Sequence, residues 1–279
     1  MTAAISTAAP SGTPEFPRTG PTITRTSRLR ERVLLPLAIE RTKSRRPWIL
    51  ATLALILAAL NTADGVFQYL RNTEIFRDQG VTWLAVWGQG GLLWSTFFLP
   101  MLITFRAAGL TRMEHEHGNW RRMATYGATI TTYTGKLILT TLFALYCQLA
   151  FLLLVMAASA ALGFHLTPAD VATMTTWALL GTFGAVTIAA AQLLVGIYVS
   201  SFATTVLTGI GASFLSLAVL LVAPPLSPLY PYSQVTIGMQ ARTMATPTPT
   251  SIAWFLIWNT ILMTATVLLS RRALRRKQH

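Results

Sequence analysis

The residues whose types could support chemistry gather in one polar segment of the chain. From Glu114 to Arg122 the sequence places two acids, two histidines and two arginines within nine residues. His115 and His117 flank Glu116, an arrangement that suggests a metal site. On a helix, however, side chains two positions apart point to opposite sides, so these two imidazoles cannot share one ion. We therefore expect a polar helix end here and no metal site.

The dipeptide Gly135-Lys136 could belong to a phosphate-binding loop, which ends in Gly-Lys followed by Ser or Thr. Here Ile130 occupies the position of the first glycine of such a loop, and Leu137 follows the lysine. The sequence also lacks the G-x-S-x-G, H-E-x-x-H and paired-cysteine patterns, and its single cysteine is Cys147. We expect no catalytic site in this chain and no cofactor bound to it.

Five polar side chains fall inside long apolar stretches. Gln89, Gln148, Gln192 and Asn259 lie in four different stretches, and Asp64 lies in the outer part of another. Amides at membrane depth usually hydrogen-bond to neighbouring helices, which is the interpretation we favour. The alternative is a substrate pathway, for which Asp64 is the best candidate because an ionisable group inside a span often has a function.

The elements that must position these residues are six apolar segments. Of the 279 residues, 53% are hydrophobic and only 11% are charged, whereas soluble domains carry about 25% charged residues. About 20 apolar helical residues cross a bilayer core roughly 30 Å thick. We predict an all-α polytopic membrane protein with a transmembrane domain at 47–270. Its six spans are expected at about 47–69, 84–105, 137–160, 175–199, 203–223 and 251–270.

The basic residues define the expected orientation. The net charge of +13 could suggest nucleic-acid binding, but the basic residues cluster beside apolar runs, so we exclude nucleic acid as a partner. Nineteen of the 22 Lys and Arg residues precede the first span, lie between the second and third spans, or follow the sixth. Since cytoplasmic segments are the ones enriched in Lys and Arg, both termini should be cytoplasmic. The expected location is the inner membrane of a bacterial cell.

The segments outside the spans have distinct compositions. Residues 1–28 are polar and Pro-rich, which is typical of a disordered cytoplasmic tail, and residues 271–279 form a basic cytoplasmic tail. Residues 29–46 have the pattern of a basic amphipathic helix that lies on the inner leaflet and leads like an elbow into the first span. Residues 224–250 are too apolar for a free loop and too Pro-rich for a span. There we expect short re-entrant or interfacial helices, with Tyr230 and Tyr232 at headgroup depth.

Small residues recur at four-residue spacing in the fourth and fifth spans. Small side chains at this spacing let helix backbones approach closely. The predicted contact faces are Gly181, Ala185 and Ala189 in the fourth span, and Thr205, Gly209 and Ser213 or Thr208, Ala212 and Ser216 in the fifth.

The chain resembles a known family of membrane proteins. A basic segment with Glu40 precedes the first span, and six spans follow in all. The residues of the polar segment that carry the resemblance are Glu114, Glu116, Gly118, Asn119, Trp120 and Arg121, followed by Gly135 and Lys136 at the third span. These features are similar to those of ABC-2 type permeases of bacterial ABC transporters, and most similar to the lantibiotic-immunity and bacitracin-resistance type permeases. The resemblance covers about residues 35–272.

The resemblance implies the function and the partners. The chain would be the permease subunit of an ATP-driven exporter, paired with a second copy or a sister permease. A cytoplasmic ABC ATPase subunit would bind ATP and Mg²⁺, and Glu114, Glu116, Gly118, Asn119, Trp120 and Arg121 would form the ATPase-coupling segment. We expect Trp120 to be an exposed anchor of that contact, since Trp and Arg are enriched at interface hot spots.

The cargo and the function class leave alternatives. The implied cargo is an amphipathic antibiotic peptide, such as a lantibiotic, expelled from the membrane for self-immunity. One alternative is the export of another drug or of a lipid. An alternative of another class is a membrane interaction or sensory subunit that transports nothing, from which no ATPase would co-purify.

Overall fold

The computed structural model describes Ala38, Glu40, residues 47–78 and residues 80–276. The described residues form helices and no strand, which confirms the predicted all-α class. Six helical stretches are long and apolar enough to cross a membrane, as predicted. They are α3 (Pro47–Arg71), the continuous stretch Trp83–His115, α8 (Thr129–Ala161), α9 (Pro168–Tyr198), α10 (Phe202–Val222) and α12 (Pro249–Arg276).

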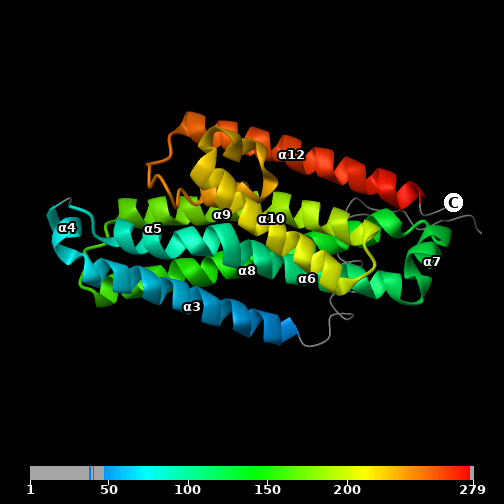
Figure 1. Ribbon diagram of the computed structural model, residues 1–279, viewed down its shortest axis with the longest axis horizontal. Coiled ribbons are helices and arrows are strands. Elements are labelled where there is room, and N and C mark those ends of the chain that lie inside the picture. The colour runs from blue at the N-terminus through cyan, green and yellow to red at the C-terminus, as the bar shows by residue number, and fades with distance from the viewer. Residues whose placement is uncertain (1–37, 39, 41–46, 79, 277–279) are drawn as a thin grey trace, which may run out of the picture.

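The six stretches form an elongated bundle around α9 (Figure 1). Helix α9 contacts α6, α8 and α12, and 67% of its most apolar stretch of 18 residues is buried. Helix α12 packs almost entirely on α9, and only 6% of its own most apolar stretch of 18 residues is buried. Apolar side chains that face outward, such as Trp254 and Leu221, are suited to contact with lipid. The bundle therefore has one central helix and lipid-facing helices at its edges.

The second span changes its helical pitch halfway along. It consists of α5 (Trp83–Leu93), a π-helical turn η2 (Trp94–Phe98) and α6 (Leu99–His115). The backbone N–H of Leu99 bonds to the carbonyl of Trp94, five residues earlier, which defines the π turn. Thr96 donates its hydroxyl to the Leu92 carbonyl at 2.6 Å and supports the widened turn. The Trp94 ring stacks on Phe151 of α8, with ring centroids 5.4 Å apart.

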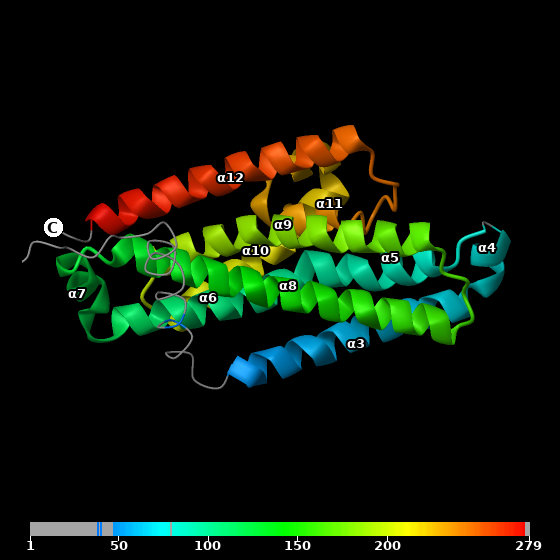
Figure 2. The same cartoon turned by 180° about the vertical axis from the view of Figure 1, so that it is seen from behind.

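Several helices run beyond the predicted spans. Helix α6 continues to His115, α8 begins at Thr129, and α12 includes Arg271–Arg276, which we expected to form a tail. With 33 residues, α8 is about 50 Å long, whereas the hydrocarbon core is roughly 30 Å thick. The bundle is therefore longer than a membrane is thick. Figures 1 and 2 both place the end of α12 and the short helix α7 (Asn119–Thr125) at the same end of it.

The predicted tail at 1–28 lies outside the described residues. So do residues 277–279 and the predicted elbow helix at 29–46, with two exceptions in the latter. Ala38 and Glu40 are described, and both are helical. At the opposite end of the bundle from α7, the short helix α4 (Thr73–Asp78) connects α3 to the second span (Figure 1).

Between α10 and α12 the chain folds back into the bundle. Two 3-10 helices, η4 (Pro224–Leu229) and η5 (Pro231–Ser233), lead into the short helix α11 (Gln234–Gly238). We call residues 224–241 the re-entrant segment; Figure 2 shows α11 beside α9 and under α12. Short helices before the last span were predicted. Tyr232 is buried, with 6% exposure, and the headgroup depth expected for the tyrosines stays a prediction.

Glycines in α9 make room for the re-entrant segment. A Cβ atom on Gly184 would lie 2.5 Å from the carbonyl oxygen of Gln234, and one on Gly181 would lie 2.5 Å from Cγ of Met239. Both distances are far below van der Waals contact, so the re-entrant segment approaches α9 more closely than any side chain would allow. The predicted small-residue face around Gly181 is therefore a contact face, and its partner includes the re-entrant segment.

We expect Gly184→Ala to destabilise the protein. The new methyl group would meet backbone atoms of Gln234 and Val235, which cannot move without displacing α11. Overpacking of this kind costs about 1–3 kcal/mol. The measurement is thermal unfolding in detergent, with Gly211→Ala as the control, because a Cβ there meets nothing within 4 Å. The control should be neutral or slightly stabilising, since alanine favours helix. Equal melting temperatures for the two variants would contradict the close approach.

Candidate functional site

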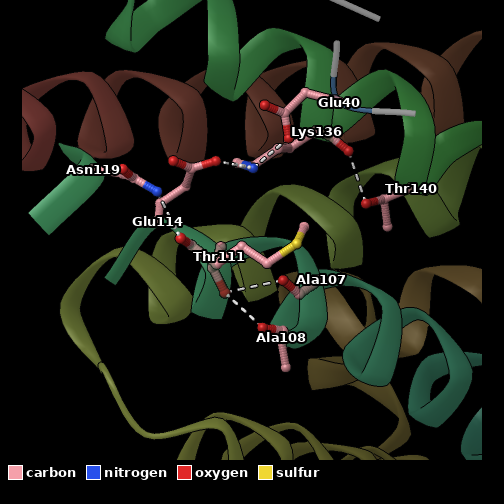
Figure 3. A network of polar contacts seen from close by, with 9 residues as sticks. Glu40, Ala107, Ala108, Thr111, Glu114, Asn119, Lys136 and Thr140 are labelled. Atoms are coloured by element: carbon pink, nitrogen blue, oxygen red, sulfur yellow. Dashed lines mark hydrogen bonds and ion pairs between the residues drawn. The ribbon is translucent and has the colours of Figure 1, made fainter. Parts of the chain in front are cut away.

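A buried ionic cluster joins three parts of the chain that are distant in sequence. Nζ of Lys136 lies 2.5 Å from Oε2 of Glu40 and 2.9 Å from Oε1 of Glu114 (Figure 3). The side chains are inaccessible to solvent, with exposures of 0% for Lys136, 2% for Glu40 and 0% for Glu114. We call these three residues the ionic cluster. It holds the segment before α3, the last turn of α6 and the start of α8 against one another.

The secondary structure positions the lysine between the two acids. Lys136 is the eighth residue of α8, about 10 Å from its start, where the helix passes α6. Thr140 donates to the Lys136 carbonyl at 2.8 Å, and Thr111 donates to the Ala107 carbonyl at 3.0 Å, so both hydroxyls are satisfied within their own helices (Figure 3). Neither hydroxyl competes for the ammonium group. Lys136 therefore has two carboxylates as its hydrogen-bond acceptors.

The polar segment after the ionic cluster is a helix, a break and a second helix. Helix α6 ends at His115, a 3-10 turn η3 spans Glu116–Gly118, and α7 follows. Gly118 has a φ of 66°, the left-handed conformation that favours glycine at such a break. The Asn119 side chain donates to the Met113 carbonyl at 3.1 Å and closes the turn. Gly118 and Asn119 thus have a local structural role as the joint between α6 and α7.

Trp120 does not lie where we expected it. The prediction of an exposed anchor is wrong, because Trp120 is only 5% exposed. It packs in a cluster with Tyr133 of α8, Ile197 of α9 and Leu274 of α12, and its ring meets His115 edge-on with centroids 6.3 Å apart. The break at Gly118 turns α7 back over the bundle, so its aromatic side chain reaches the core. Trp120 therefore fixes α7 to the ends of three spans.

The surface of the polar segment is formed by other side chains. Glu116 and Arg112 form an exposed ion pair at 2.8 Å, whereas Glu114 is buried in the ionic cluster. Arg122 is exposed, and Tyr126, directly after α7, is 83% exposed. The backbone of Arg121 lies in α7. Of the predicted coupling residues, Glu116 thus presents its side chain to solvent, and Tyr126 is an exposed aromatic residue that sequence reasoning did not select.

His115 is engaged within the bundle. One ring nitrogen, Nε2, lies 2.7 Å from the carbonyl oxygen of Gly196 near the end of α9. Gly196 also makes room for Thr111, because a Cβ there would overlap the Thr111 side chain. These contacts hold the last turns of α6, which also carry Glu114 of the ionic cluster, against α9.

The polar residues of the spans divide into two groups. Gln148 accepts a hydrogen bond from the Trp94 indole at 3.1 Å, Gln192 donates to the Thr205 carbonyl at 2.7 Å, and Asn259 donates to Gln234 at 2.9 Å. All three amides are buried and link different elements, as the favoured interpretation predicts. Asp64 and Gln89, the other two substrate-pathway candidates, are exposed on the surface of the described chain.

The buried amides of Gln192 and Asn259 form hydrogen bonds with side chains of the re-entrant segment. Tyr232 donates its hydroxyl to the Gln192 side-chain carbonyl, and the Asn259 amide bonds to the Gln234 side chain. Gln234 in turn donates to the Pro228 carbonyl at 2.7 Å. These bonds satisfy polar groups that would otherwise be buried unpaired.

Two members of the ionic cluster were not among the predicted site residues. Glu40 and Lys136 carried the family resemblance, but they stand 96 positions apart and nothing local connects them. The signal in the sequence is weak, because a lysine at the start of an apolar span can either pair with a carboxylate or extend its side chain to the membrane interface. Glu114 was predicted to belong to the ATPase-coupling segment, but its side chain is buried and pairs with Lys136 of the same chain.

Residues 36–220 match the model of a family described as ABC-2 family transporter protein. The match covers most of the chain, which therefore belongs to this family of membrane transporters. As such, the chain is the membrane-spanning permease subunit of an ABC transporter, a class of subunit that in general works with a partner that binds ATP. No curated protein and no solved structure matches the chain. All three residues of the ionic cluster lie within the matched region, whereas the re-entrant segment and α12 follow it.

We expect Lys136→Met to be strongly destabilising. It removes the cation and leaves two buried carboxylates beside each other, and breaking a buried ion pair from one side costs about 3–5 kcal/mol. Replacing all three residues by neutral ones (Lys136→Met with Glu40→Gln and Glu114→Gln) should restore much of that loss. Thermal unfolding in detergent measures both effects. The control is Glu116→Gln, whose half-exposed pair with Arg112 is worth less than about 1 kcal/mol. A Lys136→Met protein as stable as the control would contradict the burial of both carboxylates beside the lysine.

Proposed function

We propose that this chain is the permease subunit of an exporter and that the ionic cluster couples a cytoplasmic ATPase to its spans. The observation that carries the proposal is the buried contact of Lys136 with Glu40 and Glu114. It ties the polar segment to α8 and to the chain before α3. A displacement of the polar segment would thus act on α3 and α8 together, because desolvated charges cannot separate cheaply.

The surface for the ATPase is formed by Glu116, Arg122 and Tyr126. All three are exposed at one end of the bundle: Glu116 lies at the turn between α6 and α7, Arg122 lies in α7, and Tyr126 directly follows it. Tyr and Arg are enriched among residues that dominate protein interfaces. Trp120 supports this surface from beneath, since it anchors α7 on the spans. The ATPase would bind ATP and Mg²⁺, and this chain would contribute no ligand to either.

The proposed cytoplasmic position of this surface is supported by the distribution of charge. The basic end of α12, Arg271–Arg276, lies at the same end of the bundle as α7 (Figure 1). Cytoplasmic ends of spans carry the excess of Lys and Arg, so α7 and both termini would face the cytoplasm. The expected place of the chain is the inner membrane of a bacterium, next to a second copy or a sister permease.

The proposed cargo is an amphipathic antibiotic peptide such as a lantibiotic, expelled for self-immunity. The support is the resemblance in the polar segment, together with spans that expose large apolar surfaces to the bilayer. Another drug or a lipid is the alternative cargo. A sensory subunit without transport is the alternative of another class, and it predicts that no ATPase co-purifies.

We expect Tyr126→Ala to weaken ATPase binding while the bundle stays intact. Truncating an interface hot spot costs about 2 kcal/mol or more, which lowers affinity by roughly thirtyfold. The exposed ring packs little on the rest of the chain, so the melting temperature should not change. The assay is ATPase recovery with the purified permease at matched membrane levels. Phe67→Ala is the control, because Phe67 is also exposed, at 58%, but lies near the end of α3 that leads to α4, at the opposite end of the bundle from α7. Full recovery and full export with Tyr126→Ala would remove Tyr126 from the docking surface.

We also expect Trp120→Ala and Tyr126→Ala to change different properties of the protein. Trp120→Ala empties a buried site between α7 and the spans, so it should lower the melting temperature, as large aromatic truncations cost about 3–5 kcal/mol. Tyr126→Ala should affect ATPase binding alone. A Trp120→Ala protein with unchanged stability but lost ATPase binding would instead favour a tryptophan that docks directly on the ATPase.

A further inference from the structure

Two cavities flank the re-entrant segment, away from the ionic cluster. The first has a volume of about 210 Å³ and lies between α11 and the first turns of α12. The second has a volume of about 450 Å³ and lies between α11 and the end of α10. Ile237 and Gln240 border both cavities, so the two adjoin across these side chains. Neither cavity takes part in the proposed coupling.

The first cavity is apolar and is partly open at the surface of the bundle. Its walls include Leu180 of α9, Phe255 and Trp258 of α12, and the strongly exposed Trp254. The Trp258 indole donates to the Pro228 carbonyl at 2.5 Å, so its ring is held in place as part of the wall. At about 210 Å³ the cavity exceeds the roughly 150 Å³ that accommodates benzene but falls short of the roughly 300–1,000 Å³ of drug-sized pockets. It fits part of one hydrocarbon chain and is too small for a peptide.

The second cavity is lined by a positively charged side chain. Arg242 lines it together with the hydroxyl-bearing Ser227, Thr236 and Thr243. The Arg242 side chain is exposed and donates one hydrogen bond to the Leu220 carbonyl near the end of α10. Within the described part of the chain, no carboxylate forms an ion pair with it. A guanidinium group has five N–H donors, so Arg242 retains donors for an anion.

The backbone holds Arg242 in an unusual turn. Gln240 and Met244, on either side of it, have φ angles of 50° and 48°, which are uncommon for residues other than glycine. The turn is fixed by a hydrogen bond from Met244 N to the Gln240 carbonyl at 2.8 Å, and by Met244 itself, which fits against Gly88. Strained backbone of this kind persists where the surrounding structure enforces it, and it often marks a binding site.

We propose that the two cavities form one site for an anionic phospholipid of the surrounding leaflet. The phosphate group would accept hydrogen bonds from Arg242 in the second cavity, and one acyl chain would cross Ile237 into the apolar first cavity. The charge is complementary and the size fits one chain. The first cavity is lined by the exposed helix α12, and the second adjoins it at Ile237 and Gln240. Arg is well suited to phosphate because its planar fork of donors matches the oxygens. This inference does not rest on the proposed function.

The test uses quenching of tryptophan fluorescence by brominated lipid. The purified full chain in detergent is titrated with phosphatidylglycerol or phosphatidylcholine that carries bromine on the acyl chain. We expect saturable quenching with a preference for phosphatidylglycerol, since Trp254 and Trp258 line the chain cavity. Arg242→Gln should lower that preference by roughly tenfold, because it removes the cation that favours phosphatidylglycerol, with its net negative charge, over phosphatidylcholine, whose choline group offsets the charge of the phosphate. Arg242→Lys should retain most of it.

Two further variants and a melting curve separate binding at this site from general effects of charge and stability. Arg77→Gln removes an exposed cation from α4, which lines neither cavity, and it should leave the preference unchanged. Ile252→Trp fills the first cavity and should abolish the saturable quenching for both lipids. Arg242→Gln could also lower the melting temperature, since Arg242 caps α10. If Arg242→Gln lowers the melting temperature but leaves the lipid preference unchanged, Arg242 acts only as a helix cap and the proposal is overturned. Equal losses of lipid preference with Arg77→Gln and Arg242→Gln would also overturn it.

Discussion

The arrangement of the bundle end that carries α7 depends on one ammonium group without access to water. Lys136 is placed between Glu40 and Glu114, and each of these carboxylates comes from a different part of the chain. Transferring such charges out of water is expensive, and their mutual attraction offsets the cost only when the geometry is good. The cluster is therefore a weak source of stability but a strong constraint on geometry. The last turn of α6, the start of α8 and the segment before α3 have to meet at one point.

The packing on the middle of α9 depends on interactions of another kind. There the re-entrant segment reaches α9 because Gly181 and Gly184 lack side chains, and its polar groups are satisfied by the amides of Gln192 and Asn259. A backbone that leaves regular helix within a membrane has to find such partners in the protein. The result is a segment fixed by short-range packing and neutral hydrogen bonds. The contacts near α7 thus depend on charge, and those of the re-entrant segment depend on shape.

The sequence predicted the elements well and the contacts between them poorly. Six spans follow from apolar runs near 20 residues, since a bilayer imposes that length on any crossing helix. The roles of Gln148, Gln192 and Asn259 as interhelical hydrogen-bonding groups follow from the cost of unpaired amides in lipid. The burial of Trp120 could not be predicted, because the break at Gly118 decides which way α7 turns and local sequence does not specify that angle. The pairing of Lys136 with Glu40 likewise depends on how helices pack, which periodicity alone does not reveal.

The π turn at Trp94–Phe98 has a consequence for the phase of the second span. A π turn contains one residue more than an α turn, and each residue rotates a helix by about 100°. Without that extra residue, every side chain of α6 would face a direction about 100° away from its present one, relative to α5. Glu114 would then point away from Lys136, although both residues were still present. A single inserted residue in the middle of the membrane therefore sets the angular alignment of an ion pair several turns away.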